Sequence, residues 1–299
     1  MAIQMEKGKD QVGHLFLGIV VLTWGINFGI VKSAYQDLSP ILFAAIRFTV
    51  SGILVILLTF WREKELWIRK KDLLRVGMIG AMGIGLYQMF WSLGLNVTSA
   101  SNSALILSTQ PLLGALYVDL IKKEFVGRRQ YLGMLLALGG VMLVIFKPTA
   151  QLHFSLDTLW GDLLTLMAGI CAAIFFSAWS KPLLKDYSPM RLVGFCMIIG
   201  SLVLWMAALF IPQPIGLDRM GMKAWWSLGY AIFLSGVLGH ICWYEGIGRI
   251  GVTKSLTYLY LIPICAVLFN YLLMGEKIFL QQIIGGTLIL WGVHRSLRT

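Results

Sequence analysis

Apolar segments of about 20 residues recur along the whole of this 299-residue chain, and short clusters of charged residues separate them. A helix needs about 20 apolar residues to cross the hydrocarbon core of a bilayer. The composition agrees, because 58% of the residues are hydrophobic and only 13% are charged, whereas a soluble domain carries about 25% charged residues. Strands of a membrane barrel are shorter and alternate in polarity. The sequence therefore predicts an all-α integral membrane protein.

Ten of these segments are predicted to cross the membrane. They are His14–Tyr35, Ser39–Trp61, Leu73–Leu95, Ser101–Ile121, Arg128–Phe146, Leu159–Lys181, Pro189–Ile211, Ala224–Gly246, Val252–Leu273 and Phe279–His294. The connections between them are too short to form a soluble domain. The function of the chain is therefore expected to reside among the helices.

Basic residues are distributed unequally between the two sides of these segments. Most of the 25 lysine and arginine residues lie on the side that holds both termini, and Arg47 lies inside a span. The positive-inside rule places that side in the cytoplasm. We therefore expect a multi-pass protein of the cell (inner) membrane with both termini cytoplasmic. Membrane orientation also accounts for the net charge of +11, so no nucleic-acid partner is expected.

The two halves of the chain match when one is shifted along the other. A shift of 149 or 152 residues aligns identical residues, among them Asp37 with Asp186, Pro40 with Pro189, Trp91 with Trp243, Pro111 with Pro263, Gly133 with Gly285 and Gly140 with Gly292. Five spans per repeat is an odd number, so the second repeat enters the membrane from the opposite side, as in many secondary transporters. The predicted organisation is two inverted repeats around a central cavity. Its parts are a cytoplasmic tail (1–13), the first repeat (14–146), an extracytoplasmic linker (147–158), the second repeat (159–294) and a second cytoplasmic tail (295–299).

Several of these residues resemble one family, the EamA-type permeases of the drug/metabolite transporter superfamily. The segments that carry the resemblance are Leu22-Thr23-Trp24-Gly25-Ile26-Asn27-Phe28, Ser39-Pro40 with Arg47-Phe48, and the series Trp243, Arg249-Ile250-Gly251, Pro263, Gly275-Glu276, Gly285 and Gly292. The chain departs from the pattern at Lys122-Lys123-Glu124, where the family usually has Gly before Glu, and at Glu245, where an aromatic or small residue is usual. The resemblance covers nearly the whole chain. It implies ten helices around a central cavity and transport of metabolites, often export, and it leaves the substrate open.

Polar and aromatic side chains occupy equivalent places in the third and eighth spans. Gln88, Trp91 and Ser92 share one helix face, and their repeat counterparts are His240, Trp243 and Tyr244. Transporters bind substrate near the membrane midplane at the repeat interface. The predicted substrate-binding residues are Trp24, Asn27, Gln88, Trp91, Ser92, Trp179, His240, Trp243, Tyr244 and Tyr258. The alternative is that these side chains only form interhelical hydrogen bonds and packed aromatic contacts.

Two charged residues inside the spans are candidates for charge binding or coupling. Arg47 could bind an anionic group or an internal carboxylate; alternatively, it reaches the membrane surface or caps carbonyls of a neighbouring helix. Glu245 could bind a cation or exchange a proton; alternatively, it pairs with Arg249, four residues along the same helix.

Sequence motifs of enzymes and ATP-driven pumps are not found. The chain contains no Walker motif, no HExxH and no nucleophile elbow, and its four cysteines lack metal-binding spacing. We therefore expect no enzyme activity, no cofactor and no metal. The predicted function is a secondary transporter, an exporter or permease, of small metabolites such as amino acids or amphipathic and aromatic compounds. It would work by alternating access in the bilayer, with the oligomeric state left open. The alternatives are an intramembrane lipid-modifying enzyme and a non-transporting membrane scaffold.

Overall fold

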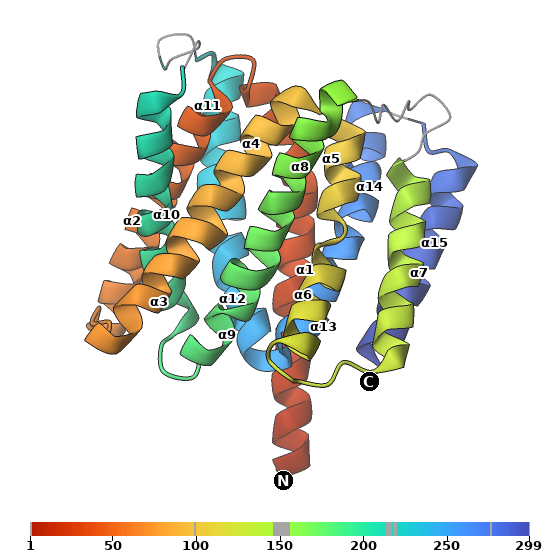
Figure 1. Ribbon diagram of the computed structural model, residues 1–299, viewed down its shortest axis with the longest axis horizontal. Helices are drawn as coiled ribbons and strands as arrows, with labels where there is room; N and C mark the ends of the chain where they lie inside the picture. Colours follow the sequence, from red (N-terminus) through yellow and green to blue (C-terminus); the bar gives the residue numbers. More distant parts are fainter. Residues whose placement is uncertain are drawn as a thin grey trace.

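The computed structural model describes residues 2–98, 100–145, 156–212, 217, 220–275 and 277–298. Most of the predicted linker (147–158) and Glu276 lie outside the described residues. The described chain is helical and contains no strand. Figure 1 shows the helices packed side by side as a bundle, with both ends of the chain at the same end of that bundle.

The helices follow the predicted apolar segments closely. They are α1 (Ala2–Ala34), α2 (Pro40–Glu63), α3 (Lys70–Gly80), η1 (Ala81–Leu86), α4 (Tyr87–Val97), α5 (Ala100–Leu107), α6 (Gln110–Leu120), α7 (Arg128–Ile145), α8 (Leu156–Cys171), η2 (Ala172–Ala178), α9 (Ser180–Leu183), α10 (Pro189–Phe210), α11 (Met222–Tyr230), η4 (Ala231–Leu238), α12 (Gly239–Ile250), α13 (Val252–Thr257), η5 (Tyr258–Leu261), α14 (Ile262–Met274) and α15 (Leu280–Leu297). Helix α1 begins at Ala2 rather than His14, because the polar N-terminal residues include no proline to break it. Its first turns extend beyond the bundle (Figure 1).

Eight helical segments of the described chain are long and apolar enough to cross a membrane. They are Pro40–Glu63, Lys70–Leu95, Asn102–Leu120, Arg128–Ile145, Thr158–Leu183, Pro189–Phe210, Met222–Ile250 and Val252–Phe269. Two further long helices, α1 and α15, have 33 and 18 residues.

Irregular turns interrupt several of these segments in the middle. The turns η1, η2 and η4 are π-helical, and π-helical turns occur frequently at functional sites. A shift of 152 residues takes η1 onto the C-terminal part of η4, so the two halves carry this irregularity at corresponding places. In two other segments the α-helix is interrupted next to a proline. Pro111 lies in the first turn of α6, and the 3-10 turn η5 directly precedes Ile262 and Pro263.

Helices of the first half pack on helices of the second half. Helix α2 packs on α10, α4 on α8, α1 on α12, α6 on α13 and α7 on α15. Figure 1 shows α7 and α15 side by side at one edge of the bundle. The last pair is close enough for backbone contact, because a Cβ atom on Gly140 would lie 2.5 Å from the carbonyl oxygen of Gly285. Most of the interhelical contacts therefore join a helix of the first half to a helix of the second half.

Polar contacts also join the halves at the end of the bundle that holds both termini. Arg191 Nη2 lies 2.8 Å from Glu63 Oε2, and the Tyr187 hydroxyl donates a hydrogen bond of 2.7 Å to Asp72 Oδ2. Burial and this hydrogen bond raise the pKa of Tyr187 above its ordinary value. The phenol therefore stays protonated at physiological pH and remains a hydrogen-bond donor.

Candidate functional site

Arg47 lies on α2 with its side chain buried between the two halves. The residue is only 5% exposed. Its Nη2 atom donates a hydrogen bond of 2.9 Å to the hydroxyl of Ser235, and its guanidinium carbon lies 4.9 Å from the centre of the Phe48 ring. No ion pair joins Arg47 to a carboxylate among the described residues. A cation therefore lies buried in the bundle beside an aromatic ring and a neutral hydroxyl.

Ser235, in the π-helical turn η4, is the hydrogen-bonding centre of this region. Its hydroxyl accepts the bond from Arg47. Its carbonyl oxygen accepts bonds from Trp24 Nε1 at 3.2 Å and from His240 Nδ1 at 3.0 Å. Ser235 is not among the residues predicted from the sequence, since a serine inside an apolar span is common and hydropathy does not reveal a π-helical turn. The structure thus connects α1, α2 and α12 through one residue.

Aromatic rings enclose His240 on several sides. Its ring centroid lies 5.3 Å from that of Trp24, 5.5 Å from that of Phe48 and 5.5 Å from that of Phe176. Because Nδ1 bonds to a carbonyl oxygen, which only accepts, the hydrogen of that bond is on Nδ1. The hydrogen bond to Ser235 and the surrounding aromatic rings therefore fix the orientation of the His240 ring.

Three tyrosines from separate parts of the chain lie near enough to Arg47 to interact with its charge. Tyr35 follows α1, Tyr87 begins α4 and Tyr230 ends α11, and each acts electrostatically on the guanidinium. The Tyr230 hydroxyl also donates a 2.9 Å hydrogen bond to the carbonyl of Thr23. Sequence periodicity within one helix cannot connect residues from separate parts of the chain, so the sequence did not predict this group. We call Trp24, Arg47, Ser235 and His240, with Tyr35, Tyr87 and Tyr230, the Arg47 cluster.

The predicted polar face of α4 is buried. Gln88, Trp91 and Ser92 are 4%, 7% and 1% exposed, and Ser92 lies beside the Tyr35 side chain of the Arg47 cluster. On α1, the Oδ1 atom of Asn27 is buried and accepts no hydrogen bond from the described residues. These side chains are therefore buried inside the bundle, which fits both the predicted binding region and its alternative of interhelical contacts.

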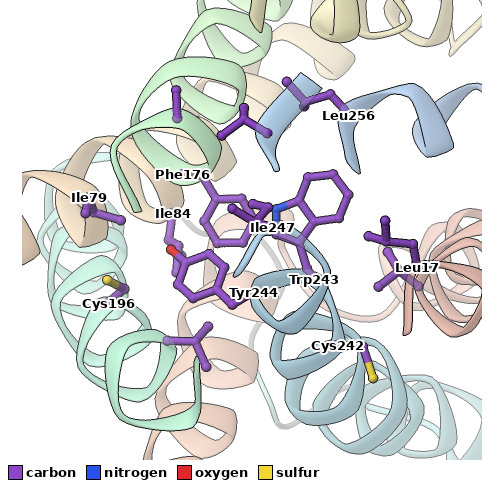
Figure 2. Packing of buried hydrophobic residues seen from close by; sticks show 14 of the residues in the cluster. Leu17, Ile79, Ile84, Phe176, Cys196, Cys242, Trp243, Tyr244, Ile247 and Leu256 are labelled. Carbon is purple, nitrogen blue, oxygen red and sulfur yellow. The ribbon is translucent and has the colours of Figure 1, made fainter. Parts of the chain in front are cut away.

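Trp243 and Tyr244 belong to the packed core of the protein. They are 1% and 0% exposed, and Figure 2 shows them with Phe176 in a cluster of buried apolar side chains. Phe176 is stacked parallel to Trp243 at 6.5 Å and lies 5.1 Å from Tyr244. In this conformation both residues have the packed aromatic contacts that were the alternative to substrate binding.

Trp179 and Tyr258 make contacts outside the Arg47 cluster. Trp179 Nε1 donates a 2.7 Å hydrogen bond to the hydroxyl of Tyr117 on α6. The Tyr258 hydroxyl lies 2.7 Å from Nδ1 of His14, near the start of the predicted first span. Their grouping with Trp24 rested on their aromatic character alone, and the structure gives them separate partners.

Glu245 forms an ion pair with Arg249, one helical turn along α12. The two side chains approach to 2.9 Å. This is the local pairing that was the alternative to a role in coupling. The pair lies on a different face of α12 from His240, because five residues separate Glu245 from His240 along a helix with 3.6 residues per turn.

Two long stretches of the chain match one protein family. The model of the family described as "EamA-like transporter family" matches residues 11–146 and, separately, residues 159–296. The chain belongs to the EamA-like transporter family. The two matched stretches together span nearly the whole chain, and this EamA-like protein therefore carries the family pattern twice.

Relatives of this EamA-like protein are named as transporters. It is 28% identical over 281 residues to "Uncharacterized transporter YyaM" of Bacillus subtilis (strain 168), covering 93% of this chain and 91% of the relative. It is also 28% identical over 283 residues to an "Uncharacterized transporter" of Archaeoglobus fulgidus, covering 94% of this chain and 96% of the relative. A solved crystal structure matches with a TM-score of 0.82 at 18% identity, over 97% of this chain and 96% of the other. That last likeness shows the fold.

Proposed function

We propose that this EamA-like protein is a secondary transporter of small metabolites in the cell membrane, and that it works by alternating access between two inverted repeats of five helices. Family membership supports a transporter role. The observation that carries the mechanism is the packing of the two halves on each other around the buried Arg47 cluster.

The glycine contacts of α7 and α15 support the inverted repeat. A shift of 152 residues relates Gly133 to Gly285 and Gly140 to Gly292. The contacts run crosswise, because Gly133 meets Gly292 and Gly140 meets Gly285. Gly133 thus touches the counterpart of Gly140, and Gly140 touches the counterpart of Gly133. A two-fold axis between the two halves produces such reciprocal contacts.

Ten membrane crossings follow when α1 and α15 are added to the eight apolar segments. An even number of crossings places both termini on one side, and Figure 1 has both ends of the chain at one end of the bundle. The excess of basic residues at that end favours the cytoplasm.

Alternating access requires contacts between the halves that can open at either end of the bundle. The end that holds the termini has the Arg191–Glu63 ion pair. Nearer the opposite end, Thr98 donates a hydrogen bond to Asp162, which joins α4 to α8. In the proposed cycle these two contacts break in turn while the Arg47 cluster stays between them.

The proposed binding region consists of the Arg47 cluster with Asn27, Gln88, Trp91 and Ser92. Trp243 and Tyr244 support it from the core. An intramembrane enzyme would need its reactive groups to face one site. His240 is held by Ser235 and Glu245 by Arg249, so these residues do not favour that alternative.

Transport by the purified protein in liposomes tests the proposal. We expect saturable uptake or counterflow for at least one compound of a broad panel of radiolabelled amino acids, organic acids and amines. Ser235→Ala should reduce this flux, because it removes the hydroxyl that binds Arg47. The matched control is Ser201→Ala, since among the described residues that buried hydroxyl bonds only to the Ile198 carbonyl of its own helix. Absence of flux for every compound, with protein shown to be folded, would contradict the proposal.

A further inference from the structure

Arg47 is a buried cation for which the described chain provides no carboxylate partner. Charged groups in a protein interior or a bilayer are normally paired, because removing a charge from water is costly. The described ion pairs of this protein join other residues, so no described carboxylate lies within ion-pair distance of the guanidinium. The charge of Arg47 therefore needs compensation from outside the described chain.

The guanidinium of Arg47 also has N–H donors that make no hydrogen bond to the described residues. Arginine carries five N–H donors. Nη2 donates to Ser235, whereas Nε is buried and has no hydrogen-bond partner among the described residues. The hydrogens of Nε and Nη2 lie along one edge of the guanidinium plane, and this edge is suited to a carboxylate with its two parallel oxygen atoms. An anion bound there would satisfy both the charge and the free donor.

The surroundings of Arg47 favour an anion with a single charge and an apolar body. Arginine remains protonated at neutral pH, whereas the phenols of Tyr35, Tyr87 and Tyr230 carry no charge there, so the cluster presents the single positive charge of the guanidinium. A doubly charged phosphate would keep an unpaired negative charge there. The rings of Phe48 and Trp24 supply apolar surface beside the polar groups.

We propose that Arg47 binds the carboxylate of the transported compound, and that the substrates are small organic monoanions with an aromatic or aliphatic body. This inference rests on the proposed transport function and adds the substrate class to it. The guanidinium contacts Ser235 and Phe48, and the carboxylate of the substrate would complete its hydrogen bonding. Amino acids satisfy the requirement only through their carboxylate, since no described acid of the cluster would bind their ammonium group.

Matched pairs of acids and amides test the inference directly. The probes are benzoate, 3-phenylpropionate, N-acetylphenylalaninate and octanoate, each with its primary amide, at pH 7. Binding to the purified protein is measured by tryptophan fluorescence and by the shift in unfolding temperature. We expect at least one acid to bind roughly tenfold more tightly than its amide, since charged hydrogen bonds are about twice as strong as neutral ones.

Variants at position 47 assign that preference to the guanidinium. Arg47→Gln should bind the acid and the amide equally, and Arg47→Lys should keep part of the preference, because it retains the charge without the planar edge. Arg62→Gln is the matched control, since Arg62 is exposed near the end of the same helix and its variant should bind like the wild type. Equal binding of acid and amide by the wild type, preference retained by Arg47→Gln, or no binding by any acid would each overturn the inference.

Stability without ligand separates a binding role from a structural one. If Arg47 awaits an anion, Arg47→Gln removes an unpaired buried charge and should leave the unfolding temperature unchanged or raise it. A fall of several degrees would show that Arg47 holds the helices together and would contradict the inference. The liposome assay keeps the two proposals distinct. Flux of neutral or cationic compounds without preference for acids rejects the carboxylate site alone, whereas absence of any flux rejects transport.

Discussion

Gly133 and Gly292 bring the backbones of α7 and α15 into contact, since a Cβ atom on Gly133 would lie 2.6 Å from the carbonyl oxygen of Gly292. The counterparts of these residues in the other half, Gly285 and Gly140, meet in the same way. A side chain larger than hydrogen is excluded at all four positions because the obstacle is backbone, which cannot rotate away. Small residues allow close helix packing in membranes. The sequence spacing of these glycines therefore reflects the interface between the two halves.

The first prediction concerns this interface. Gly140→Ala should lower the free energy of unfolding by about 1–3 kcal/mol, the usual cost of overpacking, because its Cβ would meet Gly285 O at 2.5 Å. Gly139→Ala is the matched control, since a Cβ there meets no atom within 4 Å and alanine favours the helix. Thermal unfolding in detergent measures both. Equal unfolding temperatures for the two variants would contradict the close contact.

Much of the fold could be predicted from the sequence, because the bilayer fixes the length of a crossing helix. The second half offers a clear case, where Ser188 and Pro189 mark the beginning of α10. The Ser188 hydroxyl accepts a hydrogen bond from Arg191 N, which caps the helix. Arg47 could be selected as well, since a charge within an apolar segment is conspicuous.

Other parts of the candidate site could not be predicted. The contact of Ser235 with Arg47 depends on the π-helical turn η4 and on the docking of α2 beside it, and neither has a signature in hydropathy. Tyr87 and Tyr230 come to Arg47 from separate helices, which only the three-dimensional packing brings together. The sequence grouped Trp179 with Trp24, because aromatic residues in apolar spans have the same appearance whatever their partners.

The second prediction tests the opposite orientation of the two halves. A shift of 149 residues relates Gln36 to Lys185, and both are exposed. Inverted repeats place them on opposite sides of the membrane, with Lys185 in the cytoplasm. In intact cells a membrane-impermeant maleimide should label Gln36→Cys but not Lys185→Cys. The described native cysteines are buried or partly buried, and the unsubstituted protein measures their labelling. Labelling of both positions from outside would disprove the inverted topology.

The third prediction concerns the ion pair between α10 and α2. Arg191 and Glu63 are 11% and 23% exposed, with Nη2 and Oε2 2.8 Å apart, so solvent screens them less than a surface pair. Arg191→Glu should destabilise the protein, and Glu63→Arg combined with it should restore part of the loss. We expect a coupling free energy of about 1–2 kcal/mol in a double-mutant cycle of thermal unfolding.

Transport by the same variants shows whether the Arg191–Glu63 pair also takes part in the cycle. If the pair closes the end of the bundle that holds the termini, Arg191→Glu should change the flux more in one direction than in the other. Equal effects on uptake and efflux, together with an additive double-mutant cycle, would leave the pair without a role in gating or stability.

The fourth prediction concerns Lys181, which binds the C-terminal end of α12. Its Nζ atom donates hydrogen bonds of 2.8 Å to Ile247 O and 2.9 Å to Gly248 O. These carbonyls lie in the last turn of the helix, where a positive charge is favourable. Lys181→Met keeps most of the apolar stem but removes both bonds, so it should lower the free energy of unfolding by about 1–2 kcal/mol. Lys185→Met, at an exposed position nearby, should have little effect. If both variants unfold at the wild-type temperature, the hydrogen bonds of Lys181 contribute nothing to the joining of α9 to the C-terminal end of α12.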